Sequence, residues 1–432
     1  VGSEMCIRDS YIMDLAVDKK VVVKQSGDRK LVYAAIYYYM ETSVARKLCD
    51  LDISYSCNDE EMEESIEKIE QRLNIELDEI QKEAVKKTVQ NGLVVITGGP
   101  GTGKTTTINT IIRYFQMEGL DIRLAAPTGR AAKRMSETCG MEAQTIHRLL
   151  EISGGPQEDS NGSSFATNFD RNEENPLETD AIIVDEMSMV DISIMNSLLK
   201  AVAVGTRLIL VGDTDQLPSV GAGNVFSDLI RSGRIATVAL RDIFRQAEQS
   251  MIVRNAHLVN TGMPPKLKNA AANDFFFLPR RDSVRLVETV VELCKTRLPD
   301  KMGIPADELQ VLTPTRRGDA GTRSLNFALQ AALNPPKPGK QERRFGELIF
   351  REGDRVMQTR NDYDVVWQKE DGTAGTGIFN GDVGKIAKID PSGELLEIVF
   401  DDRTATYTSD MLAELDMAYA MTVHLSLIHI SE

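Results

Sequence analysis

The feature that most constrains this chain is a glycine-rich run that stands between a strand-like segment and a helix-like segment. Leu93 to Thr97 (LVVIT) has the apolar, β-branched composition of a buried strand, and the run TTTINTIIRYF follows with helical periodicity. Between them, Gly98, Gly103, Lys104 and Thr105 satisfy the pattern G-x-x-x-x-G-K-[ST]. A glycine-rich turn that matches by chance would lack this context. The run therefore predicts a loop whose backbone amides, with the helix N-terminus, face the phosphates of a nucleoside triphosphate.

The nucleotide contacts expected from this loop can be assigned one by one. We expect Lys104 to bridge the β- and γ-phosphates, and the Thr105 hydroxyl to hold Mg²⁺. Gln81, which precedes the loop, is a candidate for reading the adenine edge, although alone it is a weak signal. The expected ATP-binding residues are Gln81, Gly98, Gly99, Pro100, Gly101, Thr102, Gly103, Lys104, Thr105 and Thr106.

Two further strand ends carry side chains suited to phosphoryl transfer. Ala181 to Val184 ends in Asp185, expected to hold Mg²⁺ through water, and Glu186, expected to orient and deprotonate the attacking water. A solvated acid pair is the alternative, and the phosphate loop upstream favours the catalytic interpretation. The strand RLILVGD is followed by Gln216, a candidate sensor of the γ-phosphate, for which a turn-forming role is the alternative.

Arg245, in the run LRDIFRQ, is a candidate positive charge for the γ-phosphate. By itself, a surface arginine on a helix is the commoner interpretation. The expected catalytic set is therefore Lys104, Asp185, Glu186, Gln216 and Arg245, with Thr105 and Asp185 as the Mg²⁺ ligands.

Composition limits the classes of protein to which the chain can belong. Its 432 residues, 42% apolar and 27% charged, suffice for two or three domains. There is no run of eighteen apolar residues and no signal-like N-terminus, so we expect no membrane partner and a cytoplasmic location, in a bacterial cytosol or nucleoid. The five cysteines form no C-x-x-C pair, which disfavours zinc and disulfides.

The formal net charge of −15 argues against a nucleic-acid partner, because phosphate backbones attract lysine and arginine. Much of the acid lies in the run Asp59 to Glu70, however, which we interpret as the solvated face of a helix or as a linker. Basic residues gather in APTGRAAKRM and TIHRLL, just past a strand end, where Thr128 and Arg130 could contact a phosphate backbone. A solvated amphipathic helix is the alternative for this cluster.

The order of segments predicts an α/β protein. Apolar runs at 93–97, 122–126, 181–184 and 208–211 each precede helix-like sequence, which indicates a parallel sheet flanked by helices. Short strands at 20–24 and 31–33 and a helix at 34–48 suggest a small accessory module, and 154–176 a polar surface loop. A strand is expected at 309–313, and turn signals between 345 and 408 indicate an inserted β-barrel.

Taken together, the runs GGPGTGKTTT, APTGRAAKRM, TIHRLL, IIVDEMSMVD, GDTDQLPSVGAGNVFSDLI, FRQ, LTPTRRGDAGTRSLN and AYAMTVH resemble the ordered motifs of RecD-like helicases of superfamily one. The resemblance covers roughly residues 75 to 424. It implies two RecA-like P-loop NTPase domains, the second interrupted by a small SH3-like β-barrel, with a small N-terminal accessory segment. It also implies ATP in the cleft between the two domains and 5′ to 3′ movement along single-stranded DNA, in DNA repair or recombination.

The resemblance divides the chain as follows: 1–10, a non-native segment; 11–75, the accessory segment and acidic linker; 76–240, the first RecA-like domain; 241–344 and 409–424, an incomplete second RecA-like domain; 345–408, the SH3-like barrel; and 425–432, a non-native tail. Its partners would be single-stranded DNA and duplex junctions, with protein partners unknown. The positions that match the family's DNA-facing motifs are Thr128, Arg130, Thr145, His147, Thr313, Pro314, Thr315, Thr422 and His424.

The sequence departs from the family's pattern after His424, where relatives continue with Lys-Ser-Gln-Gly and a later motif whose arginine contacts the γ-phosphate. Weak hydrolysis by this chain is therefore expected, and an ATP-gated, non-catalytic single-stranded DNA-binding module is the alternative function. Another P-loop machine, such as a relaxase-associated helicase or a DNA-packaging ATPase, is a third; the runs FRQ and LTPTRRGDAG argue against it.

Overall fold

The computed structural model describes residues 2–99, 101–151, 169–240, 250–270 and 272–423. These residues form two compact units, which are considered separately: the first runs to residue 266 apart from 128–130, and the second comprises 128–130 and the chain from 267 onward. Within the described ranges, none of the helices has both the length and the apolar character needed to span a membrane.

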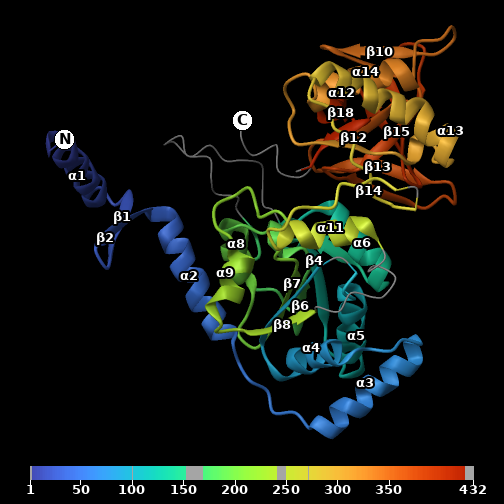
Figure 1. The fold of residues 1–432 in the computed structure, drawn as a ribbon. Coiled ribbons are helices and arrows are strands. Elements are labelled where there is room, and N and C mark those ends of the chain that lie inside the picture. The colour runs from blue at the N-terminus through green and yellow to red at the C-terminus, as the bar shows by residue number, and fades with distance from the viewer. Residues whose placement is uncertain (1, 100, 152–168, 241–249, 271, 424–432) are drawn as a thin grey trace. The chain divides into compact units, whose positions relative to one another are not determined.

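The first unit is built on a six-stranded parallel sheet with strand order β5-β4-β6-β7-β3-β8 (Figure 1). All four apolar runs expected to be strands lie in it, as predicted. The strands are β3 (Leu93–Gly98), β4 (Ile122–Ala126), β5 (Ala143–Thr145), β6 (Ala181–Val184), β7 (Arg207–Gly212) and β8 (Ala236–Leu240).

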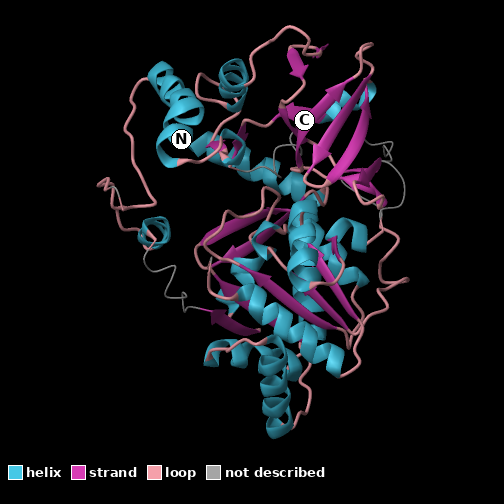
Figure 2. Cartoon of the chain, turned by 90° about the vertical axis from the view of Figure 1, so that its right-hand side faces the viewer, coloured by secondary structure: helices cyan, strands magenta, loops and turns pink. Residues whose placement is uncertain are grey.

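Helices cover both faces of this sheet, which explains why its strands are almost continuously apolar. Leu93 and Val95 of β3 enter one core, whereas Val94 and Ile96 enter the other, as the alternation of strand side chains requires. The first core receives α2 (Ala35–Leu51), α7 (Ile146–Leu149), α8 (Ile192–Ala201) and α9 (Val225–Ser232). The second receives α3 (Asp59–Leu73), α4 (Glu79–Gln90), α5 (Lys104–Met117) and α6 (Gly129–Cys139), and Figure 2 shows helices flanking the strands.

Of the two interpretations of the acidic run, a helix face and a linker, the structure confirms the helix. The run forms α3, which begins where the Asn58 side chain accepts a hydrogen bond from the Glu60 amide at 3.1 Å. Its acids face solvent, as expected, but Met62, Ile66 and Ile69 on the opposite face are each only 1% exposed and join the core beside α5. The helix is therefore part of the first unit, because its apolar stripe is buried there.

The N-terminal segment consists of α1 (Gly2–Val17), the antiparallel hairpin β1 (Val21–Ser26) and β2 (Arg29–Ala34), and α2. The expected strands and helix are confirmed, and α1 extends through residues 2–10, which the sequence interpretation set aside. The C-terminal half of α2 places Val44, Leu48 and Leu51 in the first core. The unit ends with α11 (Met251–Asn260).

The second unit joins two strands that are far apart in the chain. The expected strand near 309–313 is β9 (Val311–Thr313), which pairs in parallel with β19 (Ala420–Thr422). Beside them lie α12 (Ser283–Glu292), a π-helical turn (Leu293–Arg297), α13 (Leu298–Met302) and α14 (Thr322–Leu333).

An antiparallel sheet is inserted between α14 and β19, with strand order β14-β13-β17-β16-β15-β12-β18. Its strands are β12 (Arg355–Gln358), β13 (Asp362–Lys369), β14 (Ala374–Ile378), β15 (Val383–Ile389), β16 (Leu395–Phe400), β17 (Arg403–Thr408) and β18 (Leu415–Met417), preceded by the hairpin β10 (Glu342–Phe345) and β11 (Leu348–Arg351). The β-rich insertion thus extends past both ends of the expected range 345–408. Leu325 and Leu329 of α14 share its core, so the insertion and its host pack as one body.

Candidate functional site: a phosphate loop facing a buried acid pair

The phosphate loop connects β3 to α5 in the backbone geometry that its glycines permit. Gly101 and Gly103 have φ angles of 78° and 80°, in the left-handed region that favours glycine. At Gly98, a Cβ atom would lie 2.5 Å from the Thr102 hydroxyl oxygen and 3.0 Å from the Leu240 Cβ, so only glycine fits. Pro100 lies outside the described residues.

Lys104 is the first residue of α5, and its ammonium donates to the Gly98 carbonyl at 2.6 Å. The Thr102 hydroxyl donates to the Gly99 carbonyl at 2.9 Å. Thr105 is exposed in the first turn of α5, where the helix dipole favours anions. The loop thus closes on itself through its own carbonyls, and a lysine and a threonine stand at the positive end of a helix.

The acid pair follows β6, two strands from β3 in the sheet. The Asp185 amide donates to the Ala125 carbonyl of β4 at 3.0 Å, and the Glu186 amide donates to the Asp185 carboxylate at 2.8 Å. Glu186 has φ 55° and ψ 40°, a left-handed conformation that costs a non-glycine residue roughly 1–2 kcal/mol. Strain of this kind persists where the surrounding structure imposes it, often at functional sites.

Burial is the main influence on both acids. It raises the pKa of Asp185, against the opposing effects of the Glu186 amide, Lys104 and Arg134. Burial, and then the neighbouring Asp185 charge, raise the pKa of Glu186, while Lys104, Arg134 and a hydrogen bond with Gln216 oppose the shift. One oxygen of Glu186, Oε2, is buried and has no hydrogen-bond partner in the described structure. The charge of Lys104 therefore acts on the acid pair, and one acceptor of the pair is left for another group.

Gln216 lies in the loop after β7, the strand between β6 and β3. Its side-chain oxygen accepts a hydrogen bond from the Ser188 hydroxyl at 3.4 Å, and it also bonds with Glu186. The structure thus brings Gln216 to the acid pair. Arg245 lies outside the described residues.

Arg134 is a residue that sequence reasoning assigned differently. We grouped it with a basic cluster suited to DNA, but from α6 its charge acts on Asp185 and Glu186. The sequence gives no signal for this proximity, because α6 and β6 meet only in the folded sheet.

Gln81 combines a structural role with an unsatisfied group. Its side-chain oxygen accepts a hydrogen bond from the Asp78 backbone amide at 3.0 Å, and the Gln81 backbone amide donates to the Asp78 carboxylate at 2.7 Å. Together these bonds form a capping box at the start of α4. The side chain is 1% exposed, and its Nε2 has no partner within the described chain. Because buried donors are rarely left unpaired, Nε2 of Gln81 is a candidate donor for the adenine edge.

The DNA-facing candidates at positions 128–147 fall into two groups. Thr128 lies in the connection from β4 to α6, and Arg130 lies in the first turn of α6, at the carboxyl edge of the sheet. Thr145, by contrast, is buried, and its hydroxyl caps α7 by accepting from the Arg148 amide at 3.1 Å. The His147 and Phe169 ring centroids are 6.0 Å apart, and burial lowers the pKa of His147 against the opposing charge of Asp191.

The candidates of the second unit meet at the ends of β9 and β19, where Thr313 and Thr422 are directly paired in register. The Thr313 hydroxyl donates to the Ala320 carbonyl at 2.8 Å, and the Thr315 hydroxyl donates to the Arg317 carbonyl at 3.0 Å. Pro314 is exposed between them. His424 lies outside the described residues. Segments more than a hundred residues apart thus contribute to one edge.

Comparison with known proteins identifies the architecture. Residues 76–278 match the family described as an AAA domain, and residues 325–400 match the ATP-dependent RecD-like DNA helicase SH3 domain. The chain belongs to the RecD-like helicase family. The second match places the SH3-like domain of this RecD-like chain from α14 to β16, which accords with the core that α14 shares with the inserted sheet.

Curated relatives include the ATP-dependent RecD2 DNA helicase of Deinococcus radiodurans, 38% identical over 348 residues that cover 81% of this chain and 43% of that protein. The RecBCD enzyme subunit RecD of Mycolicibacterium smegmatis is 31% identical, over 81% of this chain and 63% of that subunit. The RecD-like chain thus spans about half the length of these relatives. A solved Pif1 helicase from Bacteroides, in complex with ADP-AlF3 and ssDNA, matches with TM-score 0.45 and 18% identity, over 82% of this chain and 84% of that one.

Proposed function

We propose that this RecD-like chain is the motor core of an ATP-dependent DNA helicase. The observation that carries the proposal is the position of the acid pair. Asp185 and Glu186 follow β6 in the same parallel sheet whose strand β3 leads into the phosphate loop, and Oε2 of Glu186 is buried without a partner in the described residues. A phosphate loop alone would serve any nucleotide-binding protein, whereas a strained, buried acid pair beside it suits hydrolysis. A non-catalytic, ATP-gated binding module would not need that pair.

In this proposal the loop amides and Lys104 bind the triphosphate, and the Gln81 amide pairs with the adenine edge. Thr105 and Asp185 would hold Mg²⁺, which would neutralise charge on the phosphates. Glu186 accepts the proton of the attacking water through its carboxylate, and Gln216 reports the γ-phosphate to that carboxylate through their hydrogen bond. Arg245 would add positive charge at the γ-phosphate.

Single-stranded DNA would lie along the carboxyl edges of both sheets. Thr128 and Arg130, which follow β4, contact its backbone, as do Pro314, Thr315 and His424. Thr313 and Thr422 are buried at the ends of β9 and β19 and position the second edge. Thr145 and His147 act by shaping the first of these edges, since the Thr145 hydroxyl caps a helix and the His147 ring is half-buried. By resemblance, movement runs 5′ to 3′ toward duplex junctions, in DNA repair or recombination within a bacterial cytosol.

We propose the domain division of the sequence analysis with two changes. Helix α3 belongs to the first RecA-like domain, because its apolar face lies in that core. The SH3-like domain also includes β10, which begins before 345, and β18, which lies after 408.

The test is ATP hydrolysis by the 432-residue chain with and without an oligothymidylate. We expect weak, DNA-stimulated turnover in the parent chain, and its complete loss in Lys104→Ala together with weaker nucleotide binding. Lys87→Ala is the matched control, because Lys87 is a surface residue of α4 paired with Glu83 at 3.3 Å. Turnover in Lys104→Ala equal to that of the parent would contradict the assignment, as would an identical loss in Lys87→Ala.

A further inference from the structure

The inserted sheet contains two neighbouring strands that pair along only part of their length. β13 pairs with β17 through Trp367, Gln368 and Lys369 alone, opposite Ala405, Thr404 and Arg403. The first part of β13, residues 362–366, has no register with β17, and a bulge interrupts its pairing with β14 over the same stretch. Beyond Ala405, the residues of β17 up to Thr408 pair only with β16 on their other side. Within the described residues, both strand edges therefore lack a ladder partner here, although the Asp364 amide donates to the Asp362 carboxylate at 2.9 Å.

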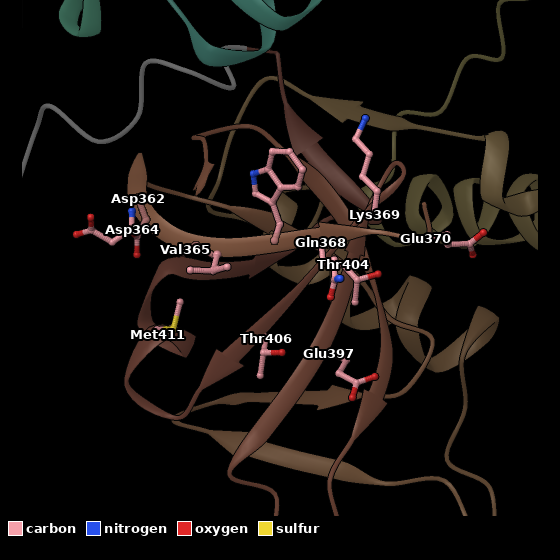
Figure 3. A pocket seen from close by; sticks show the side chains of 12 residues that line it. Asp362, Asp364, Val365, Gln368, Lys369, Glu370, Glu397, Thr404, Thr406 and Met411 are labelled. Atoms are coloured by element: carbon pink, nitrogen blue, oxygen red, sulfur yellow. The ribbon is translucent and has the colours of Figure 1, made fainter. Parts of the chain in front are cut away.

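A hollow of about 750 Å³ lies at this opening (Figure 3). Its walls come from both strands, with Val365 and Val366 on β13 and Thr406 on β17. Figure 3 shows Asp362 and Asp364 toward one end of β13, and Lys369 and Glu370 toward the other. Unpaired strand edges are templates for an added strand, and such addition is a recurrent way of binding extended peptides. The opening would accept roughly four or five extended residues at about 3.4 Å each.

The charge of the lining selects among extended ligands. Asp362, Asp364, Glu370 and Glu397 line the hollow, and Lys369 is the one cation among its lining residues. The Lys369 ammonium already pairs with Asp402 at 2.8 Å, and that contact raises its pKa. The surface is therefore acidic, so it repels a phosphate backbone and attracts lysine or arginine.

An apolar contact lies within the same surface. Val366 is 64% exposed, and Trp367 beside it is half-buried. Because successive strand residues face opposite sides, Val366 is exposed while Trp367 packs against the core. Aliphatic stems of lysine or arginine, or valine side chains, cover Val366 while their charged ends reach the acids.

We propose that this hollow, between residues 362–366 of β13 and the end of β17, binds an extended, lysine- or arginine-bearing peptide segment of a protein partner by strand addition. The backbone of the segment completes the interrupted ladder, and its cations pair with the acids on the rim. This surface lies within the second unit and does not depend on nucleotide chemistry.

The chain carries its own reporter for this site, because Trp367 is its single tryptophan. The probe is a capped heptapeptide of alternating lysine and valine, titrated into the full chain at low salt while tryptophan fluorescence is recorded. We expect a saturable change that weakens as salt is raised. The same peptide with N-methylated backbone amides should bind at least about tenfold more weakly, because methylation removes ladder donors.

The double variant Asp364→Asn/Glu397→Gln should also weaken binding about tenfold, through loss of charge at the rim. Its matched control, Asp300→Asn/Glu308→Gln, removes two exposed acids that do not line the hollow and should bind like the parent. Circular dichroism verifies the fold of each variant, and the N-methylated peptide tests the parent chain independently of any variant.

Three outcomes would overturn the proposal. The first is the absence of a saturable change with the basic peptide. The second is equal binding of a glutamate–valine peptide or of the N-methylated peptide. The third is saturation of the Trp367 signal by oligothymidylate but not by the peptide, which would make the hollow a nucleic-acid surface instead.

Discussion

Replacing Asp354 by alanine should destabilise the second unit more than any surface substitution. This carboxylate is fully buried and accepts four hydrogen bonds. The donors are the side-chain amides of Gln330 and Asn334, both at 2.6 Å, the backbone amide of Arg351 at 2.7 Å, and the Tyr419 hydroxyl at 2.9 Å. They come from α14 and its C-cap residue, the end of β11 and the residue before β19, so one side chain ties the inserted sheet to its host.

The magnitude follows from opposing effects. Hydrogen bonds to a charged group contribute about 1.5–3 kcal/mol each, which amounts to roughly 6–12 kcal/mol for four. Removing the carboxylate from water costs several kcal/mol, and the alanine variant avoids that cost. Gln330 also keeps its bond to the Ile349 carbonyl, and Asn334 its bond to the Glu352 carbonyl. We therefore expect a loss of about 3–5 kcal/mol in the free energy of unfolding.

Urea unfolding monitored by Trp367 fluorescence measures this loss, because the only tryptophan of the chain lies in the inserted sheet. The control is Asp307→Asn, which breaks an exposed ion pair with Lys385 at 3.0 Å and should cost less than about 1 kcal/mol. A change below about 1 kcal/mol in Asp354→Ala, or one no larger than in the control, would refute the argument that this carboxylate joins the two parts.

Three more predictions concern the first unit. Glu186→Gln should reduce turnover by about 10²–10⁴-fold while nucleotide binding persists, and an unchanged rate in this variant would exclude Glu186 as the base. Because burial raises the pKa of Glu186, the activity of the parent chain should fall as the pH decreases, with a midpoint above 4.5. Ile66→Ala should lower the free energy of unfolding by about 2–5 kcal/mol, measured by chemical denaturation with circular dichroism, whereas Glu67→Ala at the exposed neighbour should lower it by less than about 0.5 kcal/mol. Equal values would mean that α3 does not stabilise the unit. Gln81→Ala should weaken ATP binding about tenfold and reduce the chain's preference for ATP over GTP, whereas Glu79→Ala should change neither. Competition of each nucleotide with a fluorescent nucleotide measures both quantities.

The parallel sheet was predictable because both of its faces are buried, which leaves unbroken apolar runs in the sequence. The role of α3 was not predicted, although its signal is present: Met62, Ile66 and Ile69 follow helical spacing. The surrounding acids dominated the interpretation of that run. Net composition over a dozen residues says little about burial, because a few apolar side chains on one helical face suffice to anchor it.

The pairing of β9 with β19 illustrates a different limit. Each strand has only three residues, and the whole inserted sheet separates them. No local pattern can reveal the register of strands so short and distant, so motif order suggested their proximity but could not place Thr313 beside Thr422. The same holds for Arg134, whose proximity to the acid pair arises from the neighbouring positions of β4 and β6 in the sheet.

The left-handed backbone of Glu186 is the feature least accessible to sequence, since glutamate carries no preference for that conformation. Two contacts hold it: the Asp185 amide is bound to β4, and the Asp185 carboxylate accepts the amide of Glu186 itself. Asp185 therefore acts on Glu186 through the backbone as well as through its charge. If so, Asp185→Ala should release the strain and let the Glu186 side chain move, so its loss of turnover should exceed the loss from weaker Mg²⁺ binding. Raising Mg²⁺ to saturation separates the two effects: full recovery of turnover would show that Asp185 serves the metal alone.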